Sequence, residues 1–124
     1  MARYKMIVQL DPGEGREDAF LDFYPQTHVR DILTVPGVLS AQFLRRVHAI
    51  SDAGPHEWAY MVIYEVECDD PKELQDAMVA GMKSGAIRAD FDLLKAERRT
   101  VFYEALTDVL SGTTAGTVGG ADVG

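Results

Sequence analysis

The stretch from Trp58 to Glu67 (WAYMVIYEVE) carries the strongest strand pattern in the chain. Aromatic and β-branched residues alternate there with other side chains, and residues of these types favour β-strands. Tyr4 to Leu10 shows a similar alternation. Both faces of each stretch are largely apolar, so each strand has to be covered on both sides. The chain is therefore expected to bury a sheet beneath helices on one face and against a further layer on the other.

The first predicted helix begins near Arg16 or Glu17 and runs toward Val35. At helical spacing, one wide arc of this helix is expected to hold Phe20, Phe23, Tyr24, Thr27, His28 and Asp31. Pro25 lies inside the helix, where it removes a backbone hydrogen bond and crowds the carbonyl one turn back. The helix is therefore expected to kink at Pro25 or to consist of two short pieces.

A predicted antiparallel hairpin follows this helix. Pro36 and Gly37 stop the helix and allow the chain to turn. The next strand is predicted from Val38 to Ile50, and its partner is the strand from Trp58 to Glu67.

The second helix has a clear start, because Asp70 can cap it and Pro71 suits the first helical position. Gly85 is its expected end. A last strand is predicted from Arg98 to Ala105.

These elements follow the order β-α-β-β-α-β, which predicts an α+β, ferredoxin-like fold. Such a fold has a four-stranded antiparallel sheet with two helices on one face. The other sheet face would then be bare and apolar, so we expect two copies to pack their sheets together in a dimeric α/β-barrel. We assign residues 1–106 to this domain and residues 107–124 to a Gly- and Thr-rich tail.

Composition excludes several classes of partner. The net charge of −8 argues against nucleic acid and against anionic membranes as partners. Cys68 is the single cysteine, and the first residues do not resemble a signal peptide, so a cytoplasmic location is expected. The three histidines do not cluster at ligand spacing, so neither a metal site nor a cofactor is predicted.

The segment from Phe23 to Val38 resembles a family pattern. It has an aromatic residue followed by a histidine one turn later, and then a Pro-Gly turn into a strand. The matching residues are Phe23, Tyr24, His28, Asp31, Ile32, Leu33, Pro36, Gly37 and Val38. In this respect the chain resembles the EthD-like branch of the dimeric α/β-barrel superfamily over roughly residues 3–106. Pro25, directly after the tyrosine, departs from the pattern.

The resemblance implies a pocket between sheet and helices for a small apolar or aromatic ligand. It implies His28 as general acid or base, with Tyr24 binding a substrate oxygen or orienting the imidazole. Asp31 is alternatively a structural ion-pair partner of His28. The aromatic side chains expected to bind substrate are Phe20, Tyr60, Tyr64 and Phe91.

Three functions remain open at this point. The first is cofactor-free proton transfer by an isomerase, cyclase, lyase or monooxygenase acting on an aromatic, polyketide-like or lactone substrate. The second is a non-catalytic ligand-binding or accessory protein, and the third is haem binding. The resemblance does not identify the substrate.

Overall fold

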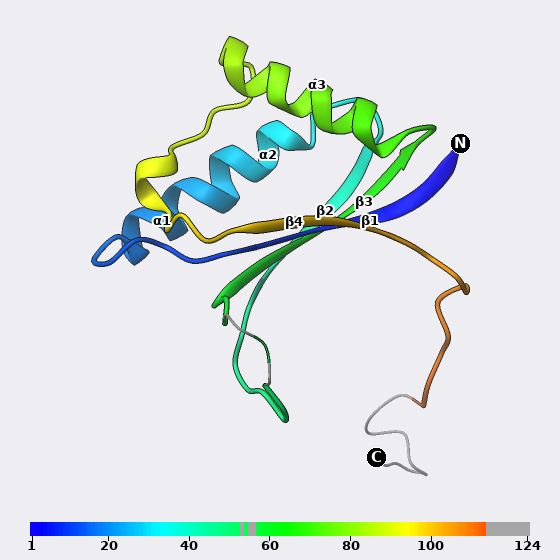
Figure 1. Cartoon of the computed structure of the whole chain (residues 1–124), viewed down its shortest axis with the longest axis horizontal. Coiled ribbons are helices and arrows are strands. Elements are labelled where there is room, and N and C mark those ends of the chain that lie inside the picture. The colour runs from blue at the N-terminus through cyan, green and yellow to red at the C-terminus, as the bar shows by residue number, and fades with distance from the viewer. Residues whose placement is uncertain (53, 55–56, 114–124) are drawn as a thin grey trace.

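Four strands form a single antiparallel sheet, and the helices cover one of its faces (Figure 1). The structure is a computed structural model that describes residues 1–52, 54 and 57–113. The strands are β1 (Ala2–Leu10), β2 (Val38–Arg45), β3 (Tyr60–Cys68) and β4 (Arg99–Glu104), in the sheet order β2-β3-β1-β4. The predicted ferredoxin-like architecture is confirmed.

The helices are α1 (Glu17–Phe23), the π-helical turn η1 (Tyr24–His28), α2 (Val29–Ile32), α3 (Pro71–Ser84) and the short 3₁₀-helix η2 (Phe91–Leu93). As predicted, Asp70 caps α3 by accepting a hydrogen bond from the Lys72 N–H at 3.0 Å. Gly85 ends the helix in a left-handed conformation, with φ of 88°. Among the residues described, no helix is long and apolar enough to cross a membrane.

Pro25 widens the first helix into a π-turn rather than breaking it. The N–H of Val29 donates to the carbonyl of Tyr24, five residues earlier. Proline has no N–H to donate and its ring crowds the carbonyl one turn back, so a wider turn relieves both problems. The chain therefore runs through α1, η1 and α2 as one continuous element (Figure 1).

The π-turn changes which side chains face the core. The buried residues of this element are Phe20, Tyr24, Val29 and Ile32. Tyr24 and Val29 are five residues apart rather than the three or four of an α-helix, because the π-turn contains one additional residue. Of the predicted arc, Phe20 and Tyr24 are buried, and the other members are half-buried. Val29 and Ile32, which the predicted arc did not include, are buried as well. His28 and Asp31 are only half-buried, at the edge of the covered face.

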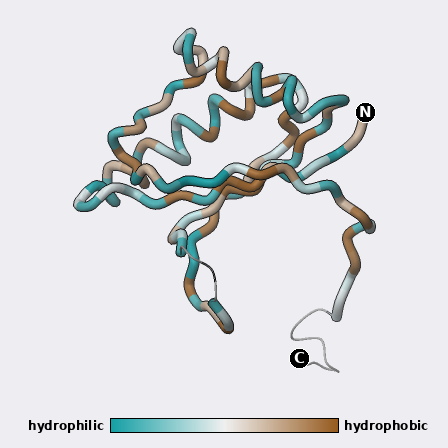
Figure 2. The backbone as a smooth tube through the Cα atoms, viewed as in Figure 1, coloured by the Kyte–Doolittle hydropathy of each residue, from teal (hydrophilic) through white to brown (hydrophobic). Residues whose placement is uncertain are grey.

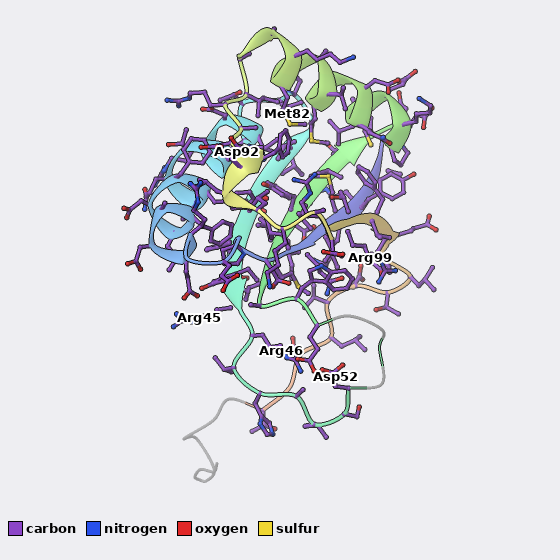
Figure 3. The ribbon with its side chains drawn as sticks, turned by 60° about the vertical axis from the view of Figure 1, so that its left-hand side comes forward. Arg45, Arg46, Asp52, Met82, Asp92 and Arg99 are labelled. Carbon is purple, nitrogen blue, oxygen red and sulfur yellow. The ribbon has the colours of Figure 1, made fainter. Side chains whose placement is uncertain are left out.

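The strand predicted from Val38 to Ile50 ends at Arg45, and its partner begins at Tyr60 rather than Trp58. Beyond Arg45 the chain leaves the sheet on the side away from the helices (Figure 1). The Arg46 guanidinium binds Asp52 and Glu57 across this extension. Figure 3 shows Arg46 and Asp52 pointing toward one another.

The core lies between the sheet and the helices. Its sheet-side members alternate along the strands, as the period of a strand requires: Met6, Leu10, Val38, Tyr60, Val62, Tyr64 and Val66. In Figure 2 hydrophobic stretches meet where the strands lie together under the helices. They also occur on both extensions below the sheet, where Ile50 and Val109 are more than nine-tenths exposed.

The C-terminal tail is described only in part. Residues 107–113 are exposed and form no helix or strand, whereas residues 114–124 lie outside the described residues. The domain boundary at residue 106 therefore stays a prediction, two residues after the end of β4 at Glu104.

We expect Gly37→Ala to destabilise the fold more than Gly15→Ala. Both glycines have positive φ, which costs about 1–2 kcal/mol for other residues. A Cβ at Gly37 would also lie 2.7 Å from the Glu67 carbonyl oxygen, whereas at Gly15 it would meet nothing within 4 Å. Urea unfolding measures the difference, and equal losses of stability would contradict it.

Candidate functional site

Tyr24 and His28 lie together at the π-turn, as the sequence predicts. Their ring centroids are 4.9 Å apart, with an angle of 30° between the planes. Tyr24 also stacks on Phe20, at 5.1 Å and 22°. The π-turn therefore keeps the two rings in contact although it rotates the rest of α2.

A hydrogen bond identifies the protonated nitrogen of His28. Its Nδ1 lies 2.8 Å from the carbonyl oxygen of Arg88. A carbonyl only accepts, so Nδ1 carries the hydrogen and donates. In the neutral imidazole the Nε2 lone pair is then left to accept a proton.

The surroundings of His28 favour its neutral form. Burial lowers the pKa of the imidazole below its ordinary value of 6.5, because the charged form loses hydration. The hydrogen bond to Arg88 and the negative charge of Asp31 act in the opposite direction and raise this pKa. Burial has the larger effect, so His28 is suited to act as a base near neutral pH.

Asp31 binds Arg88 rather than His28 directly. The Arg88 Nε donates to Oδ2 at 2.8 Å and its Nη2 donates to Oδ1 at 2.9 Å, so the pair is bidentate. The Arg88 backbone N–H donates to Oδ2 at 2.9 Å. These bonds lower the pKa of the Asp31 carboxyl from its ordinary 3.8 to about 2.

Two of the predicted substrate-binding residues belong to a packed aromatic cluster. Its members are Phe20, Tyr24, Phe43 and Tyr60, with ring centroids 5.0 to 5.9 Å apart. Phe20 is fully buried and Tyr60 is 2% exposed. The phenol of Tyr60 donates to Glu17. The structure thus places Phe20 and Tyr60 in the core, away from the cavity between sheet and helices.

That cavity lies beside the cluster, toward β4, and has a volume of about 290 Å³. Its lining is Met6, Val8, Ile32, Tyr64, Gln75, Met78, Val79, Met82, Thr100 and Phe102. None of these side chains is charged. Figure 3 shows Met82 on the side of α3 toward the sheet.

Tyr64 is the one predicted substrate-binding residue that lines the cavity. Burial raises the pKa of its phenol, and a smaller contribution comes from Tyr24. Burial likewise raises the pKa of Tyr24. Both phenols are therefore protonated at neutral pH and can donate hydrogen bonds.

Phe91 lies outside the cavity. It belongs to η2 and is 54% exposed, with the Arg98 guanidinium 4.7 Å from its ring centroid. The structure does not bring it to Tyr64. In the part of the chain that is described, no three His, Cys, Asp or Glu side chains could hold a metal ion together.

A larger hollow of about 670 Å³ lies at another end of the sheet. It is polar and surrounds Arg46 and Trp58. Arg46 is already bound to Asp52 and Glu57, and this hollow does not contain Tyr64. His28 lines neither the hollow nor the apolar cavity. The apolar cavity is therefore the better ligand site.

Two features of the site could not be found from local sequence patterns. Arg88 follows α3 and meets His28 only through the tertiary fold, 60 residues away. The cavity methionines Met78 and Met82 have helical spacing, but this spacing indicates a buried face and not a gap beneath it.

We expect the imidazole of His28 to titrate below pH 6.5, because burial disfavours its charged form. NMR titration of the ring protons measures this midpoint, and His28→Gln identifies the signal by its loss. The unfolded chain binds this proton at higher pH than the native one. Acidification below pH 6.5 should therefore reduce stability more in the native sequence than in His28→Gln. A midpoint above 6.5 would contradict the expectation.

Comparisons with known proteins bear on the fold. No family model matches the sequence, and none of the curated proteins matches it. Solved structures do match.

One is the haem degrader MhuD from Mycobacterium tuberculosis, which was solved with two haems in its active site. It has 19% identity and a TM-score of 0.58, over 86% of this chain and 98% of that one. A second is an EthD family protein from Bacillus halodurans, with 21% identity and a TM-score of 0.55, over 84% of this chain and 99% of that one. A third is a candidate monooxygenase from Shewanella loihica, with 12% identity and a TM-score of 0.57, over 86% and 97%. At these identities the likeness concerns the fold alone: the chain has a ferredoxin-like fold, similar to that of the EthD family protein.

Proposed function

We propose that the protein is an enzyme that moves a proton on a small, uncharged, mainly apolar substrate, with His28 as the general base. The observation that carries the proposal is the hydrogen bond from His28 Nδ1 to the Arg88 carbonyl. It leaves Nε2 as the basic nitrogen, and burial keeps the imidazole neutral by lowering its pKa.

The reaction class that suits this base is cofactor-free proton transfer. Nε2 removes a proton from the substrate, the imidazolium holds it, and the proton returns to another atom of the substrate. Isomerisation, cyclisation and elimination all begin in this way, as does the deprotonation that precedes reaction of a substrate with oxygen. Tyr24, kept protonated by its raised pKa, donates a hydrogen bond to a substrate oxygen or orients the imidazole.

The cavity indicates the kind of substrate. An apolar cavity of about 150 Å³ can hold benzene. At about 290 Å³ this one suits a compound of about two rings or a molecule of similar size, including an aromatic, polyketide-like or lactone compound. A charged ligand would lose its hydration without gaining a charged partner. Tyr64, Gln75 and Thr100 supply the polar groups that orient a substrate oxygen.

His28 does not line the cavity itself, but two features relate the cavity to it. Ile32, one helical turn after His28, forms part of the cavity lining. Tyr64 lines the cavity too, and its phenol lies within electrostatic reach of Tyr24, which stacks on His28. The proposed reaction requires a substrate that reaches from the cavity past Tyr64 to the imidazole.

We expect His28→Gln to lower kcat/KM by about 10² to 10⁴, the usual contribution of a general base. Tyr64→Phe should mainly raise KM, because it removes a hydrogen bond to bound substrate. Candidate compounds come from a thermal-shift screen of uncharged one- and two-ring molecules, followed by turnover assays. His48→Gln, an exposed histidine on the extension after β2, is the matched control. Full turnover by His28→Gln would contradict the proposal.

A non-catalytic binding protein is the second candidate. It is favoured by the cavity lining, in which Tyr64 is the one titratable side chain. Compounds that raise the melting temperature but are never turned over would favour it.

Haem binding is a weaker candidate, because the cavity has no cationic group to pair with the haem propionates. A Soret band on addition of haem would support it.

The sheet face away from the helices is the proposed homodimer interface. Its apolar residues are Ile7, Leu44, Met61, Ile63, Val101 and Tyr103. Ile7 pairs with both Ile63 and Val101, so these three residues form its centre. The helices leave this face uncovered, and a second copy would shield it.

We expect Ile7→Glu to yield a monomer, because it places a charge at the centre of this face. Sedimentation velocity at micromolar concentration measures the change. Leu33→Glu, at an exposed site just beyond α2, is the control and should leave the dimer intact. A native protein that is already monomeric at this concentration would overturn the dimer.

A further inference from the structure

We infer that Asp31 and Arg88 are positioning residues that fix which ring nitrogen of His28 carries the proton. The inference rests on the proposed role of His28 as a base. Neither residue is assigned a direct contact with substrate.

Arg88 contacts Asp31 and His28 with different parts of the same residue. Its guanidinium and its backbone N–H all donate to the Asp31 carboxylate, at 2.8 to 2.9 Å. Its backbone carbonyl accepts from His28 Nδ1 at 2.8 Å. Both partners belong to the first helical element, three residues apart.

The bidentate pair makes the position of the carbonyl specific. A guanidinium and a carboxylate joined by two parallel hydrogen bonds have a fixed relative orientation. The added bond from the Arg88 N–H ties the backbone of this residue to the same carboxylate. The peptide group after Arg88 is thereby held with its oxygen toward the imidazole.

The segment that carries Arg88 has few other restraints at this point. Residues 86–90 form no helix or strand. Ile87 anchors the segment on the other side, through its buried side chain and its N–H bond to the Gly81 carbonyl at 2.9 Å. The hydrogen bonds from Arg88 to Asp31 therefore hold Arg88 itself, whose carbonyl faces His28.

The chemical consequence concerns the two neutral forms of histidine. With the Arg88 carbonyl in place, Nδ1–H is the stabilised form and Nε2 is basic. If the carbonyl moves away, the proton can occupy either nitrogen. A fraction of molecules would then present an N–H where the base is needed.

The test is nitrogen-15 NMR of histidine-labelled protein above pH 7.5, which reports the protonated nitrogen without any substrate. In the native protein we expect the His28 Nδ1 signal at the position typical of a protonated ring nitrogen and Nε2 at the unprotonated position. In Asp31→Ala both signals should shift toward intermediate values. Arg88→Lys, which retains a positive charge beside Asp31, should shift them less than Arg88→Ala, and both variants keep the backbone N–H.

Asp76→Ala is the matched control, because Asp76 forms an ion pair with Lys72 on the exposed side of α3. It should leave both His28 signals unchanged. If Asp31→Ala does not fold, Asp31→Asn and Arg88→Ala provide the same measurement. Unchanged His28 signals in the folded variants would overturn the inference.

Once a substrate is known, Asp31→Ala should lower kcat by up to about a hundredfold, as when a catalytic group is misplaced, with little change in KM. The two proposals fail in different ways. Shifted signals in Asp31→Ala together with full activity of His28→Gln would refute the catalytic role and leave the positioning role intact. Unshifted signals in Asp31→Ala together with an inactive His28→Gln would refute the positioning role and support the catalytic role.

Discussion

The missing N–H of Pro25 determines the geometry of the site. Because this residue cannot continue the hydrogen-bond pattern of an α-helix, the turn widens and the helix gains one residue before Val29. Val29 and Ile32 then enter the core, whereas His28 and Asp31 move to its edge. At that edge they meet Arg88. A regular helix would direct His28 and Asp31 more toward the core, where a carboxylate without its arginine would be costly.

The space under the helices divides into two unlike halves. Toward β2 and β3, flat rings stack closely, and Phe43 and Tyr60 lie nearly parallel at 5.5 Å. Toward β1 and β4, thioethers and branched side chains leave a cavity open. Tyr64, on β3, stands where the halves meet. The packed half fixes Tyr24 and, through it, the imidazole, while the open half leaves room for a ligand.

Local patterns were sufficient to predict the fold. Alternation along Trp58–Glu67 and the cap at Asp70 act over a few residues, and the structure has the elements they predict. The predicted ends of β2 and β3 were wrong: beyond Arg45 and before Tyr60 the strand pairing gives way to an extension held by the Arg46 ion pairs and by the hydrogen bond from the Arg46 N–H to the Ala59 carbonyl. Placement of the aromatic residues was only partly predictable. Burial follows from residue type, but whether a buried ring packs, as Tyr60 does, or borders a void, as Tyr64 does, depends on contacts distant in sequence.

The three methionines of the cavity bear on how a new chemistry could arise in this fold. An unbranched thioether can change rotamer at small cost, so the walls formed by Met6, Met78 and Met82 can adapt to ligands of different outline. The rings of Tyr64 and Phe102 cannot adapt in this way. Selectivity in such a pocket depends on its rigid end. A single substitution of Tyr64 or Phe102 would change which molecules the cavity accepts. The methionine side chains would then adjust their rotamers to the new ligand.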